Sequence, residues 1–153
     1  MPHKVDVSLL TPIDKTLGDS ATDTRLLRRM ATEAQKYMLS FRWCKRIRRG
    51  WFGWGVGGVC AVFLFEIVPE SRKVDSKLWV IVGDLPPAYL VLDKSPTPMS
   101  ALKNYVDLMQ QWVEAARAGK SVDDCIPVNV APTKPNATLL KRRLAFLRTR
   151  ILA

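Results

Sequence analysis

The chain has 153 residues, of which 48% are hydrophobic, and a formal net charge of +10. This length and apolar content predict one compact domain that needs neither disulfides nor a metal to build its core. Three widely separated cysteines, Cys44, Cys60 and Cys125, suggest neither a disulfide framework nor a zinc ribbon and, with no secretory signal at the start, favour a reducing cytoplasm.

Basic residues are concentrated in two segments of the chain. Between Arg25 and Arg49 there are nine Lys or Arg and one acid, and after Asn136 there are five Lys or Arg and no acid. If these segments pack side by side, they form one positive face. The candidate residues of this basic face are Arg42, Lys45, Arg46, Arg48, Arg49, Arg142 and Arg143.

The first predicted element is a helix that follows an irregular arm. Residues 1–21 show no clear period, and we expect them to form an extended arm outside the domain at 22–153. From Thr22, a plausible N-cap, to about Ile47, apolar residues recur at the spacing of one helical face. The basic cluster that begins at Lys45 would then lie at the end of this helix, where cations favour the helix dipole.

The stretch "RRGWFGWGVGGVCAVFLFEIVP" from Arg48 has three interpretations. Gly53, Gly55 and Gly58 match the G-x-G-x-x-G fingerprint of dinucleotide sites, but a predicted helix precedes them and a predicted strand follows, which is the reverse of the order required. A membrane-associated segment at 51–68 is the second interpretation, although its 15 uncharged residues fall short of a bilayer span. The third, which we favour, is a glycine-rich connection into a buried strand over 59–68.

Two further strands and two further helices complete the predicted fold. The runs 78–84 and 88–93 read as strands, and "IPVNV" at 126–130 is a candidate edge strand. A helix is predicted after Thr97 and Pro98, up to Gly119, and another starts near Pro135. The predicted fold class is α+β, with a small antiparallel sheet of three to four strands packed against three main helices.

Catalytic constellations are sparse in this sequence. His3 is the single histidine and lies in the irregular arm, which argues against histidine-based catalysis and most histidine metal sites. Cys44, beside Lys45 and Arg46, could be a nucleophile with a lowered pKa, but a packing role is the simpler interpretation. The acids Glu66, Asp84 and Asp93 fall near strand ends and could converge in an acid/base or cation site, although turn acids are common. We predict no cofactor and no metal, and a non-enzyme in preference to an enzyme.

Two segments are candidates for binding. In "GDLPPAY", two prolines stiffen a short connection, which makes Asp84, Pro86, Pro87 and Tyr89 candidate partner-binding residues. Elsewhere Trp43, Trp51 and Trp54 alternate with the basic cluster, as in surfaces that bind single-stranded nucleic acid by stacking and charge. Their alternative role is to fill the core.

Four segments resemble a family of small bacterial proteins of uncharacterised function: "LSFRWCKRIRRGWFGWGVGGVCAVFLFEI", "LWVIVGDLPPAYLV", "PTPMSALKNYVDLMQQWVEA" and "IPVNVAPT" with "RLAFLRTRIL". The resemblance covers roughly residues 30–152 and implies a stand-alone cytoplasmic domain of a bacterium. It implies no activity and no site residues.

The predicted function is a non-catalytic protein-binding module, such as an immunity or adaptor protein. The absence of catalytic constellations, the proline loop and a basic face suited to an acidic partner support it. The alternative is a nucleic-acid-binding protein that uses the basic, Trp-containing face, and the third is a membrane-associated protein through residues 51–68.

Overall fold

The computed structural model describes residues 5–153, which form three α-helices, five strands and two short 3-10 turns. The helices are α1 (Ala21–Leu39), α2 (Pro98–Arg117) and α3 (Lys134–Arg150), and the 3-10 turns are η1 (Val7–Leu9) and η2 (Ile13–Lys15). The strands are β1 (Thr11–Pro12), β2 (Cys44–Val56), β3 (Cys60–Pro69), β4 (Lys77–Gly83) and β5 (Ala88–Leu90).

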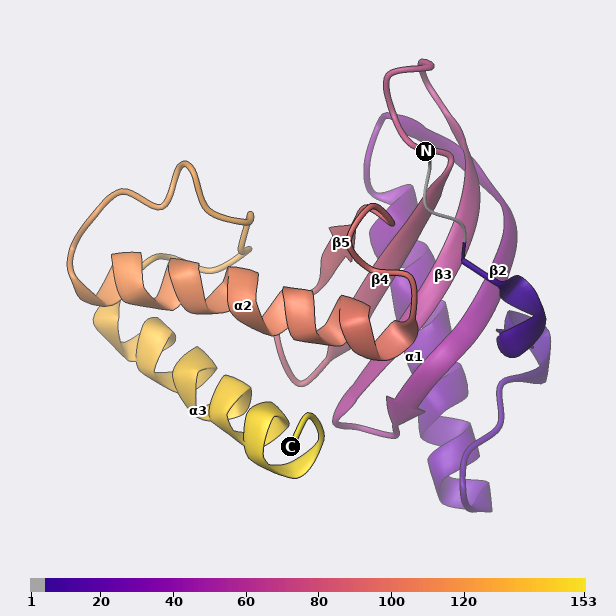
Figure 1. The fold of residues 1–153 in the computed structure, drawn as a ribbon, viewed down its shortest axis with the longest axis horizontal. Coiled ribbons are helices and arrows are strands. Elements are labelled where there is room, and N and C mark those ends of the chain that lie inside the picture. Colours follow the sequence, from indigo (N-terminus) through magenta and orange to yellow (C-terminus); the bar gives the residue numbers. More distant parts are fainter. Residues whose placement is uncertain (1–4) are drawn as a thin grey trace.

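The strands form one antiparallel sheet in the order β1-β2-β3-β4-β5, so each strand pairs with its neighbour in the sequence (Figure 1). The predicted α+β class, with an antiparallel sheet and three main helices, is confirmed. The predicted runs 59–68, 78–84 and 88–93 correspond to β3, β4 and β5, and the two strands that were not predicted are β1 and β2. A segment as short as β1, with two residues, carries little periodic signal in a sequence.

Helices cover both faces of the sheet. Helix α1 packs on one face, while α2 packs on the other and α3 lies against α2 (Figure 1). Side chains of β3 alternate between these layers: Phe63 and Phe65 face α1, whereas Val62 and Leu64 face α2. Burial on both faces explains why β3 reads as a continuous apolar run instead of alternating.

The prediction of a helix up to about Ile47 is wrong. Helix α1 begins after the N-cap Ser20 and ends at Leu39, and the basic cluster lies on β2. Pairing with the apolar strand β3 overrides the local helical pattern. Three register shifts in β2 break the alternation of its side chains, so the period of a strand is absent from its sequence.

The glycines of the predicted connection lie within β2 and its turn, so that expectation is also corrected. A Cβ at Gly53 would lie 2.8 Å from the Pro98 ring of α2, and one at Gly55 would lie 2.8 Å from Leu27 of α1. Gly58, with φ of 78°, makes the turn into β3. The glycines therefore let the two helices approach β2, and the strand–glycines–helix order of a dinucleotide site is absent over residues 44–69.

The later boundaries follow the prediction more closely. Thr97 caps α2 and Pro98 opens it, and Gly119, with φ of 69°, follows its end. Helix α3 begins at Lys134, close to the expected Pro135.

Residues 126–130 form irregular chain that packs partly against the α2 side of the core, so the predicted edge strand there is wrong. In the predicted arm, the described residues 5–20 contribute β1 and pack against both sides of the core.

Candidate functional site

The loop between β4 and β5, residues 84–87, is held at two points. The backbone N–H of Asp84 donates to the carbonyl of Val59 at 3.0 Å. The hydroxyl of Tyr105, on α2, donates to the carbonyl of Pro86 at 2.6 Å. Burial raises the pKa of Tyr105 well above its usual range, so this hydroxyl keeps its proton. With two prolines, the loop is thus a rigid surface feature.

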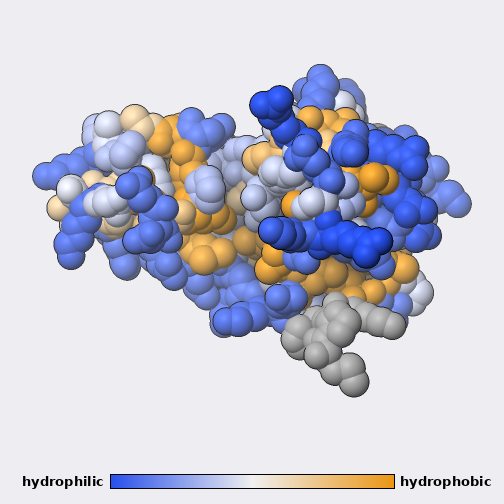
Figure 2. Space-filling view, turned by 90° about the horizontal axis from the view of Figure 1, so that it is seen from above, coloured by the Kyte–Doolittle hydropathy of each residue, from blue (hydrophilic) through white to orange (hydrophobic). Residues whose placement is uncertain are grey.

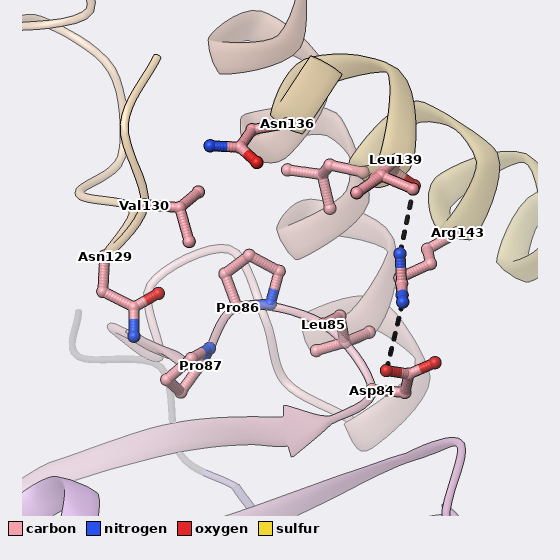
Figure 3. Close-up of a pocket in the computed structure, with 10 residues that line it drawn as sticks. Asp84, Leu85, Pro86, Pro87, Asn129, Val130, Asn136, Leu139 and Arg143 are labelled. Atoms are coloured by element: carbon pink, nitrogen blue, oxygen red, sulfur yellow. Dashed lines mark hydrogen bonds and ion pairs between the residues drawn. The ribbon is translucent and has the colours of Figure 1, made fainter. Parts of the chain in front are cut away.

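Two adjoining hollows lie between this loop and α3. The first, shown in Figure 3, has a volume of about 290 Å³ and the second of about 320 Å³, and we call them together the α3 groove. Asp84, Leu85 and Arg143 line both hollows. The first hollow is otherwise lined by Pro86, Pro87, Asn129, Val130, Asn136, Leu139 and Leu140, and the second by Gly58, Val59, Arg142, Phe146 and Leu147.

Three large apolar side chains around the α3 groove are exposed. Val130 is 43% exposed, Leu139 49% and Phe146 48%. Leu139 and Phe146 are seven residues apart on α3, so they lie on the same side of the helix, about 10 Å apart. Leu140, Leu144 and Leu147 form the buried stripe of α3. The exposed pair forms a second apolar stripe on this helix.

Basic side chains stand between the two exposed apolar residues. Arg143 forms an ion pair with Asp84 at 3.2 Å and also donates to the carbonyl of Leu139 at 3.4 Å (Figure 3). Arg142 lines the second hollow and is exposed. The α3 groove therefore combines an apolar floor and stripe with a cationic rim.

Three of the four predicted partner-binding residues meet in this groove, and the fourth does not. Asp84, Pro86 and Pro87 line it. Tyr89 lies on the opposite face of β5, where it packs edge-on against Phe41 and Trp43. Side chains alternate along a strand, so Ala88 and Leu90 face α2 and Tyr89 faces α1. Tyr89 is part of the α1-side core.

The basic residues of β2 lie at the other end of the sheet. We call this region the basic end: Arg42, Lys45, Arg46, Arg48, Arg49, and the loop 70–76 with its neighbour Lys77. Figure 2 looks onto this end of the sheet and shows hydrophilic side chains projecting from it, with hydrophobic surface between them. Arg49 binds Glu66 with two hydrogen bonds, of 3.0 and 3.2 Å, and lies 5.4 Å above the ring of Trp51.

The predicted single positive face is divided in the structure. Arg142 and Arg143 lie beside the turn at Gly58, whereas the bases of β2 lie near its start at Cys44. A strand of this length separates the two groups by roughly 30 Å. They therefore form two separate basic surfaces.

The tryptophans next to the basic cluster are engaged in packing. Trp51 is buried, and Trp54 packs against the same α2-side core. Trp43 stacks on Phe41 with ring centroids 4.9 Å apart. The neighbouring Tyr37 belongs to this cluster, and burial raises its pKa to about 12. Trp51 and Trp54 therefore pack in the core, and half-buried Trp43 borders the basic end.

The residues considered for catalysis are dispersed. Cys44 opens a strand and is buried, and burial raises the pKa of its thiol, contrary to the lowered value considered from its basic neighbours. Glu66 is paired with Arg49 and Lys77, and Asp84 with Arg143. Across residues 5–153, no cluster of three or more His, Cys, Asp or Glu is arranged to hold a metal. His3 lies outside the described residues.

Comparison of the chain with family models, curated proteins and solved structures finds no match. The resemblance to small bacterial proteins therefore stays a prediction. Among the helices that the structure describes, none is long and apolar enough to cross a membrane. Residues 51–68 form most of the β2–β3 hairpin, in the interior of the sheet.

Sequence reasoning missed Val130, Leu139 and Phe146. The signal for two of them was available, because Leu139 and Phe146 repeat at seven residues beside the buried stripe. Val130 is brought to the groove by the irregular segment before α3, where periodicity predicts nothing.

Proposed function

We propose that this protein is a binding module that recognises a second protein through the α3 groove. The observation that carries this proposal is the exposure of Leu139 and Phe146 beside a rigid loop. Three of the eight large apolar side chains exposed over residues 5–153 border this one groove. Clustered apolar exposure of this kind marks interaction surfaces.

The charge of the groove favours an acidic partner. Arg142 and Arg143 contribute two positive charges to its lining and Asp84 one negative charge. Lys141 is exposed on the same helix. Complementary charge increases the rate of encounter and selects against basic partners. An immunity protein or adaptor for an acidic target fits this surface.

The test is co-purification from the organism that encodes the protein. Tagged wild type is compared with a groove variant, Leu139→Ser with Phe146→Ser, and a control variant, Leu17→Ser with Leu39→Ser. The control removes apolar side chains of similar exposure, 68% and 50%, that lie outside the groove. We expect wild type and control to retain a stoichiometric partner that the groove variant loses.

Recovery of the same proteins with all three forms would contradict the proposal. Thermal unfolding of each purified form supplies the check on folding. Because the substituted side chains are about half exposed or more, we expect each free energy of unfolding to change by about 1 kcal/mol or less.

A further inference from the structure

The ion pair between Asp84 and Arg143 lies at the boundary between the two hollows of the α3 groove. Both residues line both hollows, whose volumes are about 290 and 320 Å³. Leu139 lies on one side of the pair and Phe146 on the other. A chain bound along the whole groove would therefore pass this ion pair.

The pair is weakly held compared with the pair that Arg49 and Glu66 form on the sheet. Arg143 contacts one oxygen of Asp84, at 3.2 Å, and the Asp84 side chain is 71% exposed. Arg49 contacts both oxygens of Glu66, whose side chain is 15% exposed and is also 4.0 Å from Lys77. Exposed, single-contact pairs are easily exchanged for other partners, whereas paired hydrogen bonds to a buried carboxylate are not.

We infer that Arg143 binds a carboxylate of the partner, and that Asp84 takes the place of this carboxylate in the free protein. The partner segment is acidic and amphipathic: its apolar side chains enter the two hollows, and a Glu or Asp between them replaces Asp84 on Arg143. This inference rests on the proposed function and names the chemistry of the partner.

The structure itself shows that Arg143 accepts a carboxylate in this position. Its other terminal nitrogen donates to the carbonyl of Leu139 at 3.4 Å, a contact within α3 that does not involve Asp84. Released Asp84 would turn into water, since its side chain is already mostly exposed. Its backbone N–H would remain bonded to Val59, so the loop would keep its course.

The experiment begins with peptides selected for the groove. A displayed library of amphipathic peptides is selected on wild-type protein, with Leu139→Ser protein for counter-selection. Fluorescence anisotropy then gives the dissociation constants of the selected peptides for wild type, Asp84→Asn, Arg143→Gln and the double variant. Asp107→Asn is the matched control, because Asp107 is half-exposed and pairs with Arg148 of α3.

We expect the selected peptides to contain an acidic residue between apolar positions. Asp84→Asn should bind them about two- to fivefold more tightly, because it removes the competing exposed carboxylate. Arg143→Gln should weaken binding about tenfold, since it removes a charged hydrogen bond. In the double variant, affinity should equal that of Arg143→Gln alone, and Asp107→Asn should leave it unchanged. Replacing the acidic residue of the peptide by Gln should abolish the effects of both groove substitutions.

Other outcomes separate this inference from the proposed function. Peptides that require Leu139 but are weakened or unaffected by Asp84→Asn would overturn the carboxylate exchange and leave the protein-binding surface intact. Equal tightening by Asp84→Asn and Asp107→Asn would overturn it as well, because net charge alone would then explain the gain. Failure to obtain any peptide that requires Leu139 would contradict the proposed function itself.

Discussion

The two ends of the β2–β3 hairpin both carry positive charge, but they present it in different settings. At the turn end, Arg142 and Arg143 border the apolar α3 groove. At the basic end, the bases of β2 stand on an exposed strand, and Arg49 is neutralised by Glu66. Apolar exposure beside charge favours specific protein binding, whereas charge alone on a strand favours solubility and weak, salt-sensitive contacts.

The charges of β2 also have a structural role. In the part of the chain that the structure describes, β1 pairs with Trp51 and Phe52 alone, so the outer edge of β2 near its start has no neighbouring strand. Exposed edges invite pairing with another chain, and natural proteins block them with charged side chains and bulges. Lys45, Arg46 and Arg48, with the register shifts of β2, provide both devices here.

The largest expected effect is the loss of stability on replacing Gly83, the last residue of β4 before the loop 84–87. Gly83 has φ of 149°, and a Cβ there would collide with the Val59 carbonyl. We expect Gly83→Ala to lower the free energy of unfolding by about 3 kcal/mol, from backbone strain and overpacking together. Gly119→Ala is the control, because Gly119 also has positive φ, 69°, but no atom within 4 Å, and it should cost about 1 kcal/mol. Urea unfolding measures both, and equal losses would contradict the packing argument.

The second prediction concerns how the free energy of unfolding depends on pH through a buried thiol at the turn end of the hairpin. Cys60 opens β3 beneath α2, and burial raises its pKa from 9.0 to about 12. The folded thiol thus ionises later than the unfolded one, so its contribution to stability is complete below about pH 9 and is lost as the pH rises towards 12. Between about pH 8 and pH 11, we expect wild type to lose about 3 kcal/mol more than Cys60→Ala. Parallel losses in urea unfolding would show that this thiol does not contribute.

A third prediction tests the role of charge at the basic end. Replacing Arg46 and Arg48 by Val should make the free edge of β2 apolar and cause self-association, which size-exclusion chromatography with light scattering would detect. Lys141→Val with Arg150→Val removes the same charge from α3, where no strand edge is exposed, and should change the molar mass less. If the β2 variant behaves as wild type does, the edge is protected by other means.

The smallest expected effect is nucleic-acid binding at the basic end. A labelled single-stranded oligonucleotide should bind at low salt and lose roughly tenfold or more in affinity by about 0.15 M salt, because only charge drives the contact. Fluorescence anisotropy would measure it, with Arg46→Glu, Arg48→Glu and Arg49→Glu as the variant. Tight binding at the higher salt that disappears in this variant would instead favour the nucleic-acid alternative.

Some parts of this fold could be predicted from the sequence for clear physical reasons. Helix α2 has a capping threonine, a proline at its first position and a glycine after its end, and each acts locally. Strand β2 lacks such signals, since its bulges and arginines hide its period and its conformation depends on pairing with β3. The candidate site was half predictable: the prolines marked the loop at Asp84, but the contact with Arg143, 59 residues later, depends on tertiary packing.

The most direct test of the account places a photo-crosslinking amino acid at Phe146 in one form of the protein and at Arg48 in another. After irradiation in cells of the native organism, the protein adducts formed at the turn end are compared with those formed at the basic end. We predict one discrete protein adduct from position 146, lost when Leu139 is also replaced by Ser, and no discrete adduct from position 48. A discrete adduct from position 48 and none from position 146 would contradict the assignment of binding to the α3 groove.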